Sequence, residues 1–144
     1  KVDSSQAIRL ISSIGRRVPA YCTALGKALL SDYDDDKIRS LFPSPFARYT
    51  DNTLMCVDDL CRAIHEQAVE GVFRENEESR ENVVCFSVPL RQHGRIVAAT
   101  SISVPKFRLN AEKEAEVIDS LHTYQERAAK ILESYPDCDG LLLG

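Results

Sequence analysis

Apolar and polar residues alternate along two consecutive segments in the middle of the chain. Residues 83–90 (VVCFSVPL) and 95–105 (RIVAATSISVP) are joined by a polar turn containing glycine, Gln92-His93-Gly94-Arg95. Because alternate side chains of a strand share a face, the pattern predicts a sheet with one apolar face and one face of small polar groups. The apolar set is Phe86, Val88, Ile102 and Val104, and the small polar set is Cys85, Ser87, Ser101 and Ser103. Such a polar face suits a pocket for a small polar ligand.

Helical spacing of apolar residues predicts three helices before these strands and one after them. Thr23 is predicted to cap the first, and Asp34-Asp-Asp36 to form the first turn of a short second helix ended by Pro43. The third carries Leu60, Ile64 and Ala68 and is predicted to end at Gly71. Asn110 is predicted to cap the last helix, whose long apolar stripe comprises Val117, Ile118, Leu121, Tyr124, Gln125, Ala128, Ile131, Leu132 and Tyr135.

A short β-like run at residues 8–12 precedes the first helix, so the order is strand, helices, strands, helix. This order predicts an α+β domain with a mostly antiparallel sheet. We expect one domain over residues 1–136 and a flexible tail over 137–144. Since the chain begins at Lys1, we interpret it as a piece of a longer protein.

Composition narrows the function classes. The 144 residues are 44% hydrophobic, enough for a core, and the formal charge of −4 argues against this segment binding a polyanion by itself. No window resembles a membrane span, and no membrane partner is expected. Five scattered cysteines, an odd number, favour a reduced, cytoplasmic setting.

Three groups of residues are candidates for ligand binding. Small residues at the start of the first helix, Ala24 and Gly26, would let a carboxylate approach free backbone N–H groups. From this segment alone, however, a helix end packed against the sheet is the favoured explanation. Ser101 and Ser103 can donate to a carboxylate, or else face solvent. Glu75 can accept from sugar-type hydroxyls, whereas Glu77 and Glu78 are expected to form a solvated turn.

Metal and nucleophile chemistry are disfavoured by spacing. Cys61 and His65 are four residues apart on one predicted helix, but no Cys-x-x-Cys pair or third ligand accompanies them. Cys85 would need a histidine to act as a nucleophile, and nothing in the sequence brings one to it, so a small buried thiol is the expected role. We expect no metal, no cofactor and no catalytic residues.

Taken together, six short motifs resemble the effector-binding domain of the isocitrate lyase regulator (IclR) family of bacterial transcription factors. In chain order they are Ile14-Gly15-Arg16-Arg17-x-Pro19-x-Tyr21, Thr23-Ala24-x-Gly26-Lys27-Ala28-Leu29-Leu30, Tyr49-Thr50-x-Asn52-Thr53, Glu77-Glu78, Val83-x-Cys85-x-x-Val88-Pro89 and Ser101-Ile102-Ser103-x-Pro105. The resemblance implies a GAF-like domain, with a central antiparallel sheet flanked by helices. It also implies that the DNA-reading winged helix-turn-helix lies N-terminal to these residues.

Carried over by position, the resemblance implies a ligand-binding set of Ala24, Leu25, Glu75, Cys85, Ser101 and Ser103. The implied ligand is a small carboxylate effector. The region around Asp3 and residues 13–17 looks closest to the branch that responds to 2-keto-3-deoxygluconate and related sugar acids. Family members also form dimers and tetramers. Three positions depart from the family pattern and bear on ligand identity: Glu75 for Asp, Asn82 for Gly and Ser87 for Ala.

The expected function is therefore a ligand-sensing domain that controls DNA binding allosterically, without chemistry of its own. Two alternatives stay open at this point. One is a GAF-like enzyme that uses Cys85 or Cys22 as a nucleophile, which predicts a depressed thiol pKa. The other is a dimerisation module without a ligand.

Overall fold

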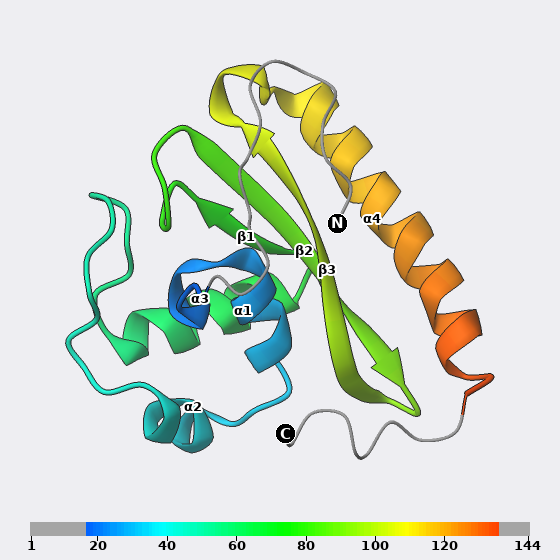
Figure 1. Cartoon of the computed structure of the whole chain (residues 1–144), viewed down its shortest axis with the longest axis horizontal. Coiled ribbons are helices and arrows are strands. Elements are labelled where there is room, and N and C mark those ends of the chain that lie inside the picture. Colours follow the sequence, from blue (N-terminus) through cyan, green and yellow to red (C-terminus); the bar gives the residue numbers. More distant parts are fainter. Residues whose placement is uncertain (1–16, 136–144) are drawn as a thin grey trace.

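The computed structural model describes residues 17–135, so the strand predicted at residues 8–12, the region around Asp3 and the tail at 137–144 lie outside the described residues. Four α-helices and three strands make up the described part (Figure 1). In chain order they are the 3₁₀ helix η1 (Ala20–Cys22), α1 (Ala24–Leu30), α2 (Asp35–Leu41), α3 (Val57–Ala68), β1 (Phe73–Asn76), β2 (Val83–Gln92), β3 (Arg95–Pro105), the 3₁₀ helix η2 (Lys106–Arg108) and α4 (Ala111–Leu132).

The three strands form one antiparallel sheet in the order β1-β2-β3. Strands β2 and β3 make a long hairpin that turns at His93 and Gly94, whose φ angles of 49° and 80° are those of a tight two-residue hairpin turn. The two predicted strands and the turn between them are confirmed. Strand β1 was not predicted, because its four residues (FREN) carry two charges and read as part of an acidic turn.

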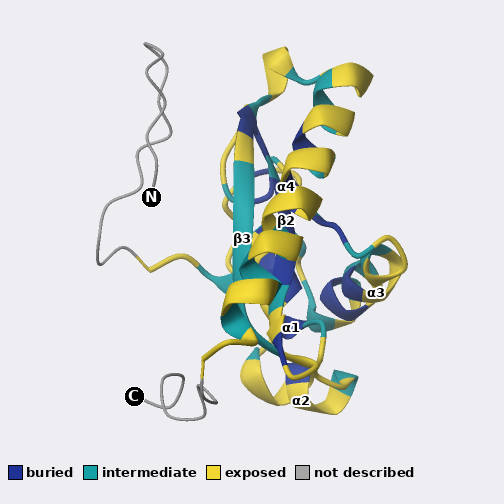
Figure 2. Ribbon diagram, turned by 90° about the vertical axis from the view of Figure 1, so that its right-hand side faces the viewer, coloured by how far each residue is buried: buried dark blue, intermediate teal, exposed yellow. Residues whose placement is uncertain are grey.

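Helix α4 covers one face of the sheet (Figures 1 and 2). The core on this face is built from residues that alternate along the hairpin and from one side of the helix. Its buried members are Val72, Val84, Phe86, Val88, Val104, Val117 and Leu121, with Ile102 packed against them. The apolar face predicted from alternation is therefore confirmed.

Helices α1, α2 and α3 build a second core on the opposite face. Its buried members are Tyr21, Cys22, Ala28, Leu30, Ile38, Phe46, Leu60, Cys61, Ile64 and Phe73, and Ala99 of β3 packs against them. Strand residues of the predicted polar face thus lie on the side of the sheet that α1 covers. The α+β fold with an antiparallel sheet flanked by helices is confirmed.

The predicted helix caps are confirmed as well. The backbone N–H of Gly26 donates to Thr23 Oγ1 at 3.0 Å, and the N–H of Lys113 donates to Asn110 Oδ1 at 2.8 Å. Helix α3 ends close to Gly71, which adopts a φ of 72°. These caps satisfy N–H groups that the first turn of a helix leaves without internal partners.

The apolar stripe predicted for α4 is only partly buried. Val117 and Leu121 are buried, whereas Tyr124, Ile131 and Tyr135 are 54–60% exposed. Strand β1 pairs with β2 no further than Ser87, so within residues 17–135 only the β2–β3 hairpin lies beneath the second half of the helix. That ribbon is too narrow to cover the whole stripe. Within residues 17–135, no helix is both long and apolar enough to span a bilayer.

Candidate functional site

The strand register brings three of the predicted ligand residues into one row across the sheet. Glu75 of β1 pairs with Cys85 of β2, and Cys85 pairs with Ser103 of β3. The next row on the same face contains Ser87 and Ser101. Because cross-strand partners project to the same side, the acceptor, the thiol and the hydroxyls line up on the face that α1 covers.

These side chains differ in exposure. Glu75 and Ser87 are fully buried, Cys85 and Ser101 are half-buried, and Ser103 is exposed. Ser103 Oγ lies 3.1 Å from Cys85 Sγ, within hydrogen-bonding distance for sulfur. Ser87 Oγ donates to the backbone carbonyl of Thr100 at 2.8 Å. The row therefore runs from a buried carboxylate at β1 to an open hydroxyl at the edge of β3.

The Glu75 carboxylate is bound by backbone N–H groups at one of its two oxygens, and the Cys85 thiol is its neighbour in the row. Its Oε1 accepts from the backbone N–H groups of Glu78 and Ser79, at 2.6 and 2.9 Å. Its Oε2 is buried and has no hydrogen-bond partner among the described residues. Since buried polar atoms are nearly always paired, this oxygen indicates a missing donor at this face, and Glu78 Oε2 in the adjoining turn is a second buried oxygen of the same kind.

The start of α1 contributes backbone groups and a close contact. Ala24 is buried and Leu25 is 38% exposed. A Cβ added to Gly26 would lie 2.1 Å from the carbonyl oxygen of Ala20, so the absence of a side chain there is required by packing against η1. This packing, against η1 rather than the sheet, explains Gly26, while the roles of Ala24 and Leu25 stay predictions.

The expectation of a solvated turn is wrong for Glu78. This residue is 8% exposed, and its Oε1 lies 2.5 Å from Nζ of Lys27, which is 1% exposed. Burial raises the pKa of Glu78, and the charge of Lys27 opposes that rise. Glu77 is half-buried, and its hydrogen bonds with Lys106 and with the N–H of Asn82 lower its pKa.

Sequence reasoning included Lys27 in a family motif but gave it no role of its own. The signal that could have found it is its spacing, because it lies three residues after Ala24 and one before Ala28, on the buried side of α1. A lysine at such a position needs a buried partner of opposite charge. Lys27 Nζ also donates to the carbonyl of Arg74 at 2.9 Å, which ties α1 to β1.

The two thiols considered as nucleophiles are held in their neutral form. Burial is the main reason that the pKa of Cys85 is raised to about 12, and a hydrogen bond from Ser103 opposes this only in part. Burial likewise raises the pKa of Cys22 to about 11, with further contributions from the Glu75 and Glu78 carboxylates. A nucleophilic cysteine requires a lowered pKa, so the geometry does not favour thiol chemistry.

The Cys61 and His65 pair does not converge on a metal site within residues 17–135. Cys61 is buried in the core beneath α3, whereas His65 is exposed and its Nε2 lies 3.0 Å from Asp35 Oδ1. Both side chains have Asp35 as a neighbour, but within residues 17–135 they form no group that could hold a metal ion.

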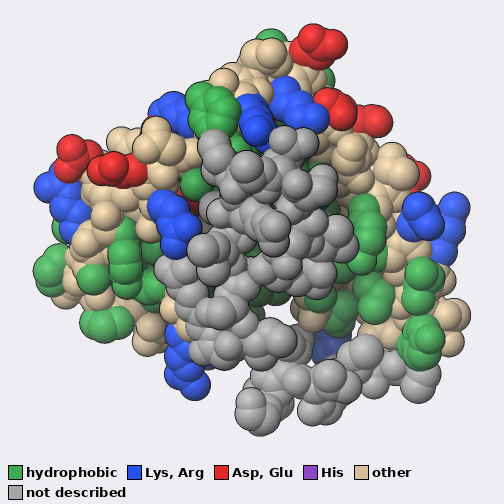
Figure 3. Space-filling model, turned by 45° about the horizontal axis from the view of Figure 1, so that its top comes forward, with side chains coloured by type: hydrophobic (Ala, Val, Ile, Leu, Met, Phe, Trp, Pro, Cys, Tyr) green, Lys and Arg blue, Asp and Glu red, His purple; other side chains and the backbone are tan. Residues whose placement is uncertain are grey.

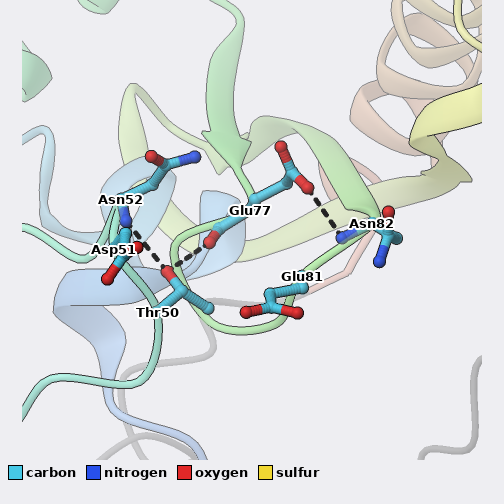
Figure 4. Close-up of a pocket in the computed structure, with 6 residues that line it drawn as sticks. All are labelled: Thr50, Asp51, Asn52, Glu77, Glu81 and Asn82. Atoms are coloured by element: carbon cyan, nitrogen blue, oxygen red, sulfur yellow. Dashed lines mark hydrogen bonds between the residues drawn. The ribbon is translucent and has the colours of Figure 1, made fainter.

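An open cavity of about 250 Å³ lies away from the row, between the loop before α3 and the turn after β1 (Figure 4). It is lined by Thr50, Asp51, Asn52, Glu77, Glu81 and Asn82. Thr50 Oγ1 donates to the carbonyl of Glu77 at 2.5 Å. The cavity contains none of the six predicted ligand residues, and of its three carboxylates Asp51 is paired with Arg48 and Glu77 with Lys106.

Comparison with known families gives the assignment. The profile described as "Bacterial transcriptional regulator IclR C-terminal" matches residues 1–130. The chain belongs to this family. The resemblance drawn from the six motifs is confirmed, and this IclR domain is a regulatory domain of the type found in such transcription factors.

Named relatives are transcriptional regulators. The IclR domain is 34% identical over 125 residues to the HTH-type transcriptional regulator KdgR of Escherichia coli, a match covering 85% of this chain and 48% of that protein. The chain thus spans about half the length of the curated relatives it matches.

Solved structures agree with the assignment. The crystal structure of the C-terminal domain of E. coli KdgR has a TM-score of 0.78 at 31% identity, covering 88% of this chain and 79% of that one. A putative transcriptional regulator from Rhodococcus has a TM-score of 0.84 at 29% identity, covering 92% and 55% of the two chains.

Proposed function

We propose that this domain binds a small hydroxylated carboxylate, a keto acid or sugar acid, and thereby controls DNA binding by an N-terminal domain in the full-length protein. The observation that carries the proposal is the buried, unpartnered Oε2 of Glu75 in one row with Cys85 and Ser103. A buried acceptor without a donor fits a ligand that brings a hydroxyl to it.

Each group in the site then has a defined role. The backbone N–H groups of Ala24 and Leu25 and the hydroxyls of Ser101 and Ser103 would donate to the ligand carboxylate. Glu75 would accept from a ligand hydroxyl, and Cys85 would pack beneath the ligand as a neutral thiol. A hydrogen bond to a charged group contributes about 1.5–3 kcal/mol, so a few such bonds support specific binding.

Control of DNA binding requires that the ligand bind two arrangements of the protein with different affinity. We propose that these arrangements are two ways of pairing sensor domains in a dimer or tetramer, which would change the spacing of the DNA-binding domains. The protein would act in the cytoplasm. Its named relatives with known roles are regulators rather than enzymes, which supports a role without catalysis.

The proposal is tested by a thermal-shift screen of this chain against sugar acids and keto acids. The set should include 2-keto-3-deoxygluconate, gluconate, pyruvate and glyoxylate, with glucose as an uncharged hydroxylated control. At about 100 times its dissociation constant, a true ligand adds roughly 2.7 kcal/mol to the free energy of unfolding. A shift with an acid but not with glucose supports the proposal, whereas no shift with any acid would favour a dimerisation module.

A further inference from the structure

Lys27 occupies an unusual position for a charged side chain. It is 1% exposed, and its Nζ contacts Glu78 Oε1 at 2.5 Å and the carbonyl of Arg74 at 2.9 Å. The first contact reaches the turn after β1 and the second reaches β1 itself. The Lys27 side chain therefore links α1 both to β1 and to the turn after β1.

The turn that Lys27 fastens is the one that holds Glu75. The backbone N–H of Glu78 donates to Glu75 Oε1 at 2.6 Å, and that of Ser79 donates to the same oxygen at 2.9 Å. Lys27 therefore binds the side chain of Glu78, and the main chain of Glu78 binds Glu75. The other carboxylate oxygen of Glu75 is the one left without a partner among the described residues.

We propose that Lys27 is a positioning residue for the effector site. By binding Glu78 from α1, it fixes the turn whose amides bind one oxygen of Glu75, and this keeps the other oxygen available to a ligand hydroxyl. The part of this inference that concerns affinity rests on the proposed function, whereas the part that concerns the turn does not.

A purely stabilising role is the main alternative. Buried ion pairs contribute little net stability, because removing two charges from water offsets most of their attraction. Stability alone therefore gives a weak reason for a lysine at this position. A defined turn geometry at Glu75 gives a specific one. Thr53 Oγ1 already donates to the Glu78 carbonyl at 2.7 Å, and Lys27 adds a second hold on Glu78 through its side chain, next to the two amides that bind Oε1.

The variants must separate these roles. Lys27→Met alone leaves the Glu78 charge buried without its partner and is expected to destabilise the fold. Lys27→Met combined with Glu78→Gln removes both charges and keeps both side-chain volumes. Its reference is Glu78→Gln alone, in which Lys27 Nζ keeps the Arg74 carbonyl and faces a neutral amide in place of the carboxylate. Arg91→Met is a control for loss of an ion pair elsewhere in the fold, because it removes the more exposed pair with Asp32.

The first test needs no ligand and follows amide hydrogen exchange by NMR. Relative to Glu78→Gln, the double variant should exchange the amide protons of Glu78 and Ser79 at least tenfold faster, while Arg91→Met leaves both unchanged. Unchanged protection of both amides in the double variant would overturn the proposal.

The second test measures affinity for 2-keto-3-deoxygluconate by calorimetry. The double variant should bind at least tenfold more weakly than Glu78→Gln, and the loss should disappear when both proteins also carry Glu75→Gln. The same loss in the Glu75→Gln background would show that Lys27 does not act through Glu75. If the unmodified chain binds no acid, the proposed function fails, and hydrogen exchange still decides the role of Lys27.

Discussion

Ser103 Oγ lies 3.1 Å from Cys85 Sγ across the β2–β3 pair. Because Glu75 pairs with Cys85 from the other side, the contact extends the row from the buried carboxylate to the exposed end of the site. In the proposed site, the hydroxyl at that end and its neighbour Ser101 would be the side-chain donors to a ligand carboxylate.

Removing both hydroxyls should therefore weaken effector binding. We expect Ser101→Ala with Ser103→Ala to lower the affinity for an acid identified in the screen at least tenfold by calorimetry, since each lost charge-assisted hydrogen bond is worth about 1.5–3 kcal/mol. Ser120→Ala on the exposed side of α4 is the control and should bind normally. An unchanged affinity of the double variant would remove the serines from the site.

The thiol of Cys85 should be unreactive in the folded protein. Its pKa is raised from an ordinary 9.0 to about 12, so at pH 8 the thiolate population is on the order of 1,000-fold smaller than in the unfolded chain. Alkylation with iodoacetamide, followed by mass spectrometry of the Cys85 peptide, should be much slower than in a denatured control. Alkylation as fast as in the control would revive the enzyme alternative.

The raised pKa of Cys85 also predicts that the free energy of unfolding falls at alkaline pH. A raised pKa means that the folded state keeps its proton between pH 9 and 12 while the unfolded state loses it. The contribution of the protonated Cys85 thiol to the free energy of unfolding is fully present below pH 9. It falls as pH rises from 9 to 12, by at most about 1.4 kcal/mol per pH unit. Urea unfolding of Cys85→Ala should show a shallower alkaline decline than the unmodified chain.

Local signals made most of the fold predictable. Alternation identified the faces of β2 and β3, and Thr23 and Asn110 marked helix starts, because each signal depends on neighbouring residues alone. Strand β1 escaped prediction because a four-residue strand with charges owes its conformation to pairing with β2. The resemblance named Glu75 and Ser103 as ligand groups, but only the three-strand register places them in one row with Cys85.

The ion pair between Lys27 and Glu78 shows where sequence reasoning fails. Its partners are 51 residues apart and come from a helix and a turn, so nothing local indicates that either charge is buried. The expectation of a solvated turn applied a rule for surface charges to a residue that tertiary packing encloses.

Gly26 should be intolerant of even one methyl group. Because its Cβ would lie 2.1 Å from the carbonyl oxygen of Ala20, Gly26→Ala forces α1 away from η1. Overpacking of this kind costs typically 1–3 kcal/mol and here involves rigid backbone, which outweighs the gain of up to about 1 kcal/mol from replacing glycine in a helix. Thermal unfolding should show a clear loss of stability, and an increase would contradict the close packing of α1 on η1.

The two halves of α4 should respond differently to truncation. Leu121 is 1% exposed in the core beneath the helix, so Leu121→Ala should lower the free energy of unfolding by about 2–5 kcal/mol. Ile131 is 59% exposed, and Ile131→Ala should change it by less than about 0.5 kcal/mol in this chain. Urea denaturation of the two variants checks both values. Figure 3 shows hydrophobic side chains on the side of the molecule where α4 lies. Tyr124 and Ile131 of this helix are exposed. A large cost at Ile131 that depends on protein concentration would show that this half of α4 is buried in a self-associated form.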